Sequence, residues 1–206
     1  MKRIVVLVLL FVSIGATARG LSFSEEMHGY AYYQSEFRDT DVYLYITVGN
    51  IDAWRADQNY PATVSGTLYL ERIPTQAISG TLQILAPAPG DDGRLLAYRF
   101  SSASLQFVGV KHVHDDHGLD LIDDMTTLRG AMLPKNQVPP SIAHLLYADA
   151  WTSELHFEWW KPGTVWDFST SMSTINTPWY QELQVRALFL ETVFGDLPRE
   201  FFPWLF

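Results

Sequence analysis

The chain has 206 residues, with 14 basic and 23 acidic side chains, a formal net charge of −9 and no cysteine. The acidic excess argues against binding to nucleic acid or to an anionic membrane surface, because like charges repel. Without disulfides the stability must come from burial of apolar side chains, for which seven Trp, ten Tyr and twelve Phe are available.

Residues 1–18 are predicted to be an export signal. A basic start and an apolar run from Ile4 to about Ala16 are followed by the small residues Ala16-Thr17-Ala18, which is typical of a signal peptide cleaved after Ala18. The apolar run is shorter than the roughly 20 residues that a transmembrane helix needs. We therefore expect a periplasmic or secreted protein with no transmembrane anchor after cleavage, formed by a single β-rich domain over residues 19–206.

Alternation of apolar and polar residues predicts that strands dominate the mature chain. In the segment DVYLYITV, for example, Val42, Leu44, Ile46 and Val48 share one face. The predicted strands lie in the segments 27–33, 41–48, 62–73, 78–87, 95–102, 104–111, 154–161 and 164–173. Roughly eight strands in one domain indicate an all-β fold, either an eight-stranded antiparallel barrel or a two-sheet sandwich with a few short helices.

Three short helices are expected between or after these strands. The first covers NIDAWRAD, with Asn50 as its N-cap, and the second covers LDLIDDMTTLRGAML at 119–133. The third covers 177–194 and is expected to lie across the barrel mouth or one sheet. Its apolar stripe is predicted to contain Trp179, Leu183, Leu190 and Phe194.

The stretch GVKHVHDDHGLDLIDD at 109–124 contains a candidate zinc site formed by His112, His114, Asp116 and His117. Their spacing resembles the H-x-H-x-D-H pattern of metallo-β-lactamase-like hydrolases, in which zinc activates a bound water. That fold uses further ligands at long range, whereas only His144 and His156 follow here. A zinc-dependent hydrolase is therefore an alternative to a protein without catalytic activity.

The aspartates of the same stretch support two other hypotheses. Their oxygens are suitable ligands for calcium, which exported proteins meet at high concentration. The same carboxylates are also suited to cap a turn and the N-terminus of a following helix. The aspartates concerned are Asp115, Asp116, Asp120, Asp123 and Asp124.

Aromatic side chains suggest a cavity for an apolar ligand. An eight-stranded barrel has an interior that can hold one small molecule, and such sites are lined mainly by apolar and aromatic groups. Packing of these rings in a filled core is the other explanation. The candidate ligand-binding residues are Tyr30, Tyr32, Trp159, Trp166 and Trp179.

Two motifs resemble a known family. Phe23, Glu25, Met27 and Gly29 form an F-x-E-x-M-x-G opening, and a G-x-K-x-V-x-D-D-x-G-x-D motif begins at Gly109. Both are similar to a β-rich accessory domain found beside cholesterol-oxidase-like members of the glucose-methanol-choline oxidoreductases and beside some α/β-hydrolases. The resemblance implies a structural role for Asp115, Asp116, Gly118 and Asp120, and variable positions for His112, His114 and His117. It implies no activity.

Together these patterns predict an exported, non-catalytic β domain that needs no cofactor. We expect it to bind an apolar, lipid-like or sterol-like molecule, or to act as an accessory module with a protein partner that metabolises lipids or sterols. A zinc-dependent hydrolase is one alternative, and calcium bound by the aspartates is a separate alternative for the cofactor. A small outer-membrane barrel is another, suggested by the alternation of Phe202, Trp204 and Phe206 at the C-terminus.

Overall fold

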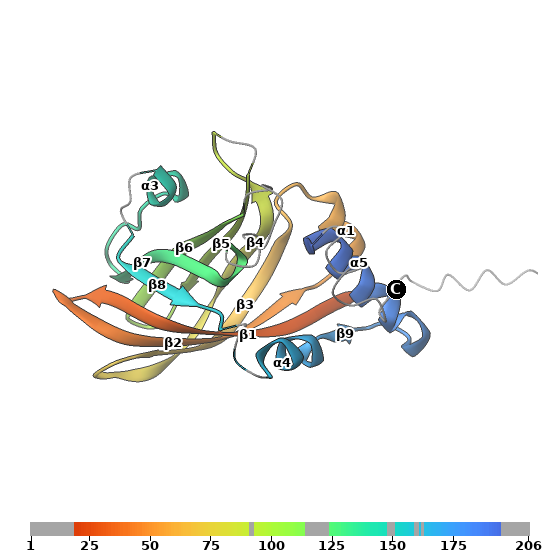
Figure 1. Ribbon diagram of the computed structural model, residues 1–206, viewed down its shortest axis with the longest axis horizontal. Coiled ribbons are helices and arrows are strands. Elements are labelled where there is room, and N and C mark those ends of the chain that lie inside the picture. The colour runs from red at the N-terminus through yellow and green to blue at the C-terminus, as the bar shows by residue number, and fades with distance from the viewer. Residues whose placement is uncertain are drawn as a thin grey trace, which may run out of the picture.

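A closed antiparallel barrel of eight strands, with one additional strand and a few short helices, forms the architecture in the computed structural model (Figure 1). The structure describes residues 19–90, 93–113, 124–147, 151–158, 161 and 163–194. The predicted all-β class is confirmed, and of its two predicted forms the structure has the barrel. The predicted export signal lies outside the described residues.

The described residues form nine strands and, besides the helical residues 124–126, five short helical segments. The strands are β1 (Gly20–Tyr33), β2 (Glu36–Val48), β3 (Pro61–Leu70), β4 (Ile73–Pro87), β5 (Arg94–Ser101), β6 (Leu105–Val113), β7 (Thr127–Pro134), β8 (Ser153–His156) and β9 (Ser173–Ile175). The helices are α1 (Ile51–Ala56), α3 (Ile142–Tyr147), α4 (Thr164–Ser171), the 3-10 turn η1 (Trp179–Gln181) and α5 (Glu182–Phe194).

Neighbouring strands in the sequence pair from β1 to β8, and β8 then returns to β1 to close the barrel. Strand β1 pairs with β2 along its length, from Leu21 opposite Val48 to Tyr33 opposite Glu36. Its other edge is shared by two strands. β8 pairs with residues 28–31 and β9 with residues 20–22.

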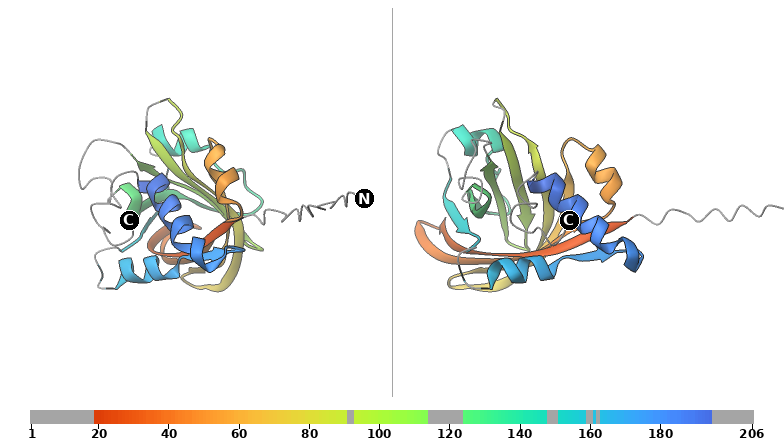
Figure 2. Two further views of the ribbon diagram at one scale, coloured as in Figure 1. Left: turned by 90° about the vertical axis from the view of Figure 1, so that its right-hand side faces the viewer. Right: turned by 45° about the vertical axis from the view of Figure 1, so that its right-hand side comes forward.

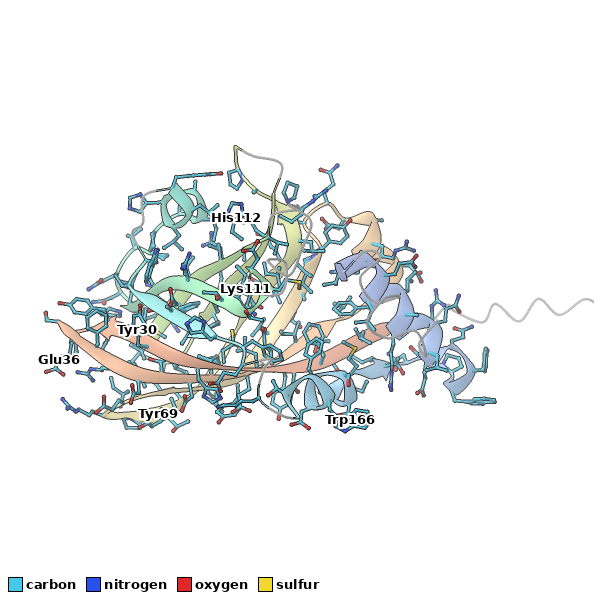
Figure 3. All side chains as sticks on the ribbon, viewed as in Figure 1. Tyr30, Glu36, Tyr69, Lys111, His112 and Trp166 are labelled. Carbon is cyan, nitrogen blue, oxygen red and sulfur yellow. The ribbon has the colours of Figure 1, made fainter. Side chains whose placement is uncertain are left out.

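The barrel interior is mainly apolar because alternate side chains of each strand point inward and most of these are apolar. In β2 the buried apolar residues are those that the sequence pattern predicts, Val42, Leu44, Ile46 and Val48. The rings of Phe100 and Phe107 stack with centroids 4.8 Å apart in the same core. Lys111 points inward from β6, whereas Tyr69 and Trp166 are on the outside (Figure 3).

The helices cover the barrel from different sides (Figure 2). Helix α5 packs into the core, where Phe189 contacts Phe23 and Trp54 at ring-centroid distances of 5.2 and 5.4 Å. Helix α3 covers the outer side of β6, with Leu145 against Val108 and Val110. Helix α4 lies against the outside of β1. None of the described helices is long and apolar enough to span a membrane.

Two predicted elements are wrong. Residues 127–133, expected to continue a helix, belong to strand β7, because both edges of that segment pair with β6 and β8. The segment 164–173, expected as a strand, is mostly helix α4. Hydroxyls of Ser169 and Thr170 bond to the carbonyl oxygen of Trp166 one turn earlier, which suits a helical conformation.

The predicted stripe of the last helix is also wrong in part. Trp179 and Leu183 are exposed, and the buried side chains are Val185, Phe189, Leu190 and Val193. Trp179 lies before α5, in the 3-10 turn η1, and Leu183 lies in the first turn of α5, ahead of the buried residues 185–193. Of the predicted residues whose side chains the structure describes, only Leu190 is buried.

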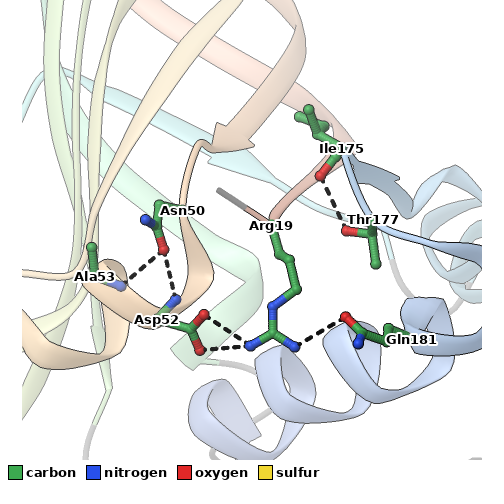
Figure 4. A network of polar contacts seen from close by, with 7 residues as sticks. All are labelled: Arg19, Asn50, Asp52, Ala53, Ile175, Thr177 and Gln181. Carbon is green, nitrogen blue, oxygen red and sulfur yellow. Dashed lines mark hydrogen bonds and ion pairs between the residues drawn. The ribbon is translucent and has the colours of Figure 1, made fainter. Parts of the chain in front are cut away.

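The predicted N-cap of α1 is confirmed. The side chain of Asn50 accepts hydrogen bonds from the backbone nitrogens of Asp52 and Ala53, at 3.0 and 3.1 Å (Figure 4). The Asp52 carboxylate in turn binds the guanidinium of Arg19, which also contacts Gln181 at 3.4 Å. This network joins the start of β1 to α1 and η1.

We expect Asn50→Ala to lower the free energy of unfolding by about 0.5 to 2 kcal/mol, because two backbone donors lose their acceptor. Urea unfolding measures this change. The control is Asn136→Ala, at an exposed position of the β7–α3 loop. Equal stability of the two variants would contradict the capping role.

Candidate functional site

A cleft of about 250 Å³ lies between the outer face of the β1–β2 pair and α4, and we name it the α4 cleft. Its walls include aromatic and charged side chains from both sides. The aromatic ones are Tyr43, Tyr45, Phe157 and Phe168, and the charged or titratable ones with side chains facing outward are Glu26, His28, Glu158, Lys161 and Asp167.

The cleft exists because two separate strands, β8 and β9, pair with one edge of β1 and leave a gap between them. Among the described strands, none pairs with residues 23–27 on the edge where β8 has ended and β9 has not begun. The chain between β8 and β9 leaves the barrel wall there and forms α4. Ser24 donates its backbone N–H to the hydroxyl of Ser171 at 3.0 Å, and Phe168 packs against Phe23 at 5.6 Å between ring centroids.

His28 lies among carboxylates at one end of the cleft. Its Nδ1 is 2.8 Å from an oxygen of Asp41, its register partner on β2, and its Nε2 is 2.9 Å from Glu26. A carboxylate of Glu158 is 4.0 Å from the same Nε2. Ionised carboxylates only accept hydrogen bonds, so both close contacts are hydrogen bonds only when each ring nitrogen carries a proton.

Tyrosine side chains form the rim beside His28. A hydrogen bond with Glu26 raises the pKa of Tyr43, and burial and the neighbouring carboxylates add to the effect. The Tyr43 ring lies edge-on to the His28 ring at 6.4 Å. The side chains of Tyr43 and Tyr45 are 43% and 61% exposed, so core packing does not account for them.

Carboxylates outnumber cationic groups on the opposite wall. Glu158 forms an ion pair with Lys161, while Asp167 stands on the first turn of α4. The Glu158 side chain is only 22% exposed and that of Lys161 is 56% exposed. The carboxylate is therefore held in place, and its cationic partner extends into solvent.

A second polar cluster lies inside the barrel. Glu25 on β1 accepts a hydrogen bond from the hydroxyl of Tyr98 on β5 at 2.8 Å and another from the ammonium of Lys111 on β6. The Lys111 nitrogen also lies 5.4 Å from the centre of the Tyr98 ring. All three side chains are buried, and Lys111 is 1% exposed. The two sequence motifs that contain Glu25 and Lys111 thus meet across the barrel.

We expect Lys111→Met to lower the free energy of unfolding by about 3 to 5 kcal/mol, because it leaves a buried carboxylate without its cationic partner. The double variant Glu25→Leu/Lys111→Met removes both charges and should be more stable than the single variant. Urea unfolding of the two variants measures the difference. A double variant that is less stable than Lys111→Met would contradict the buried ion pair.

Tyr98 makes stability depend on alkaline pH. Burial, with the Glu25 carboxylate, raises the pKa of Tyr98 well above its ordinary value of 10.0. The folded state therefore keeps this proton when the unfolded state has lost it, so the stabilisation is complete below about pH 10 and decreases above it, by up to about 1.4 kcal/mol per pH unit.

We expect the free energy of unfolding of the parent protein to fall more steeply between pH 10 and 11.5 than that of Tyr98→Phe, as measured by urea unfolding across about pH 8 to 11.5. Tyr69→Phe, at an exposed position, should keep the parental slope. Identical slopes for the parent and Tyr98→Phe would contradict the raised pKa.

The predicted ligand-binding residues are at other places. Tyr30 and Tyr32 are on the outer face of β1, where both pack against Phe37 at ring-centroid distances of 5.4 and 5.1 Å. Trp166 and Trp179 are 68% and 83% exposed on α4 and η1. None of these four lines the α4 cleft. Trp159 lies outside the described residues, and a binding role for the set stays a prediction.

The predicted metal site is mostly beyond what the structure describes. His112 is partly buried on β6, whereas His114, Asp115, Asp116, His117, Gly118 and Asp120 lie outside the described residues. Within the described part of the chain, no three His, Asp or Glu side chains are arranged to hold a metal ion. The zinc, calcium and turn-capping hypotheses for this stretch therefore stay predictions.

The cleft residues were not predicted as a site. Alternation does place Glu26 and His28 on the same outward face of β1, which is a signal in the sequence. It does not show that Asp41 lies opposite His28, because that depends on the register of β1 with β2. Alternation also does not show that Glu158 lies near His28, since that contact needs the closed barrel.

Comparison with known proteins adds no assignment: no protein-family model, no curated protein and no solved structure matches this chain. The resemblance to an accessory domain beside cholesterol-oxidase-like enzymes stays a prediction. Function is therefore inferred from the geometry of the chain itself.

Proposed function

We propose that this protein is an exported, non-catalytic binding module, and that the α4 cleft binds a small molecule or end group with an apolar body. The observation that carries this proposal is the composition of the cleft, in which Tyr43, Tyr45, Phe157 and Phe168 surround a few polar groups. Small-molecule sites are concave, mainly apolar and aromatic, and have a few polar groups that orient the ligand.

The α4 cleft lies outside the barrel, whereas the expected cavity was inside it. The inward positions of the described strands belong to one continuous apolar core that includes Met27, Leu44 and Phe107. Helix α5 adds Phe189 to that core. These side chains fill inward positions that an internal ligand would need, so the external cleft is the better supported site.

The size of the cleft limits what it can enclose. Its volume of about 250 Å³ is a little below the roughly 300 to 1,000 Å³ of typical ligand pockets. It suits one ring or a short alkyl segment, or one end of a longer lipid-like molecule. An accessory module that holds such an end for a lipid- or sterol-metabolising partner is compatible with this size.

The arrangement of His28 supports binding over catalysis. A general base needs a free lone pair within reach of the substrate. Both ring nitrogens of His28 instead face carboxylates, Asp41 on one side and Glu26 on the other. In this geometry the two carboxylates hold the imidazole as part of the cleft wall, with neither ring nitrogen directed at the open cleft.

The distribution of polarity bears on the outer-membrane alternative. A barrel that crosses a bilayer has an apolar outer band and a polar interior. Here the core is apolar, and the outward positions of β3 include the exposed Thr63, Ser65 and Thr67. This pattern favours a barrel surrounded by water.

A titration of the purified protein with six-carbon alkyl compounds tests the proposed site, with calorimetry and thermal shift as readouts. We expect at least one compound to bind and, at about 100 Kd, to stabilise the fold by roughly 2.7 kcal/mol. Tyr45→Ala should weaken this binding, because it removes an exposed wall of the cleft.

The matched control is Tyr69→Ala, which truncates another exposed tyrosine on the outer face of the sheet but outside the cleft. Its affinity should equal that of the parent. Absence of binding for every compound, or equal losses in the two variants, would overturn the proposed site.

A further inference from the structure

We propose that the α4 cleft selects a ligand whose apolar body carries an ammonium group. This inference rests on the proposed function and concerns only the charge of the ligand. Its basis is the combination of aromatic rings, an excess of carboxylates and an intramolecular ammonium that already pairs with one of these carboxylates.

The charges of the cleft favour a cation. The carboxylates of Glu26, Glu158 and Asp167 line it, with Lys161 as the one lysine among its lining residues. His28 lies between Glu26 and Asp41, so its ring nitrogens contact carboxylates of the wall and are not directed at a ligand. A carboxylate or phosphate headgroup would meet repulsion here, whereas an ammonium group would be attracted.

The aromatic rim gives independent support. The rings of Tyr43 and Tyr45 are exposed, and the residues opposite them on β1, Glu26 and Ser24, are polar. Aromatic faces attract organic cations, and rings that line a partly desolvated site attract them more strongly. Tyrosines beside carboxylates therefore suit an alkylammonium group better than a neutral or anionic head.

Lys161 shows how such a group would bind. Its ammonium pairs with the partly buried Glu158, which also faces His28 at 4.0 Å. The Lys161 side chain is largely in solvent and carries the flexible four-carbon stem of lysine, so it can move away at little cost. We infer that a ligand ammonium displaces Lys161 from Glu158, with Lys161 as a built-in competitor.

This competition gives the inference a specific signature. Loss of Glu158 charge should weaken binding of a cation, whereas loss of Lys161 charge should strengthen it. A general effect of net charge would change affinity in the same directions wherever a charge is altered. Charge variants inside and outside the cleft therefore distinguish local competition by Lys161 from an effect of the net charge of the protein.

The experiment measures Kd by calorimetry for n-hexylammonium, n-hexanol and hexanoate, which share one alkyl body. We expect n-hexylammonium to bind about tenfold more tightly than n-hexanol, and hexanoate to bind most weakly. Glu158→Gln should remove most of this preference, and Lys161→Met should tighten n-hexylammonium binding several-fold. Asp167→Asn, on the exposed side of α4, is a second variant in case Glu158→Gln does not fold.

The matched control is Glu36→Gln, which removes the same charge at the start of β2, where Glu36 pairs with Arg72 outside the cleft. It should leave all three affinities unchanged. An alkylammonium group also occurs in lysine side chains, so a short lysine peptide and its acetyl-lysine form make a second arm. If the lysine peptide bound more tightly than n-hexylammonium, the proposal that the ligand is a small molecule would be overturned.

The outcomes separate this inference from the proposed function. If none of the three compounds binds, the binding site itself is wrong. If all three bind with similar Kd, the cleft is a binding site and the selection for ammonium is wrong. If Lys161→Met weakens n-hexylammonium binding, or Glu36→Gln weakens it as much as Glu158→Gln, the competition at Glu158 is wrong.

Discussion

Closure of the barrel through β1 is the constraint on which the other features depend. One edge of this strand pairs with β2 along its length, and the other edge is divided between β8 and β9. Because β8 is only four residues long, the wall cannot continue along residues 23–27. The chain crosses that interval as a helix outside the barrel, and the α4 cleft is the space between this helix and the strands.

The alternation of β1 then supplies two different polar environments from adjacent residues. Glu25 points into the barrel, where Tyr98 and Lys111 satisfy it, and Glu26 points outward to His28 and the cleft. Low dielectric inside the barrel makes the inner cluster costly unless all its members are paired. Outside, partial exposure leaves the carboxylates available to a ligand.

The strand pattern was predictable because half-buried strands repeat every two residues and need no knowledge of their neighbours. The cap of α1 was predictable because Asn50 bonds only to residues two and three positions away. β7 and α4 were not. Segments with mixed propensity adopt whichever structure the surrounding chain can pair or pack, and that depends on distant residues. The predicted apolar stripe of the last helix failed for a related reason, since only the part of α5 that packs on the core, residues 185–193, is buried.

The sequence by itself determined the all-β class, the alternating core faces and the acidic, cysteine-free composition, because these follow from residue types and short spacings. Tertiary structure alone decided that the strands close into a barrel and that Glu25 meets Lys111. It also decided that Glu26, His28, Asp41 and Glu158 gather beside aromatic rings. Each of these contacts joins residues brought together by strand register and barrel closure, and neither can be read from local spacing along the chain.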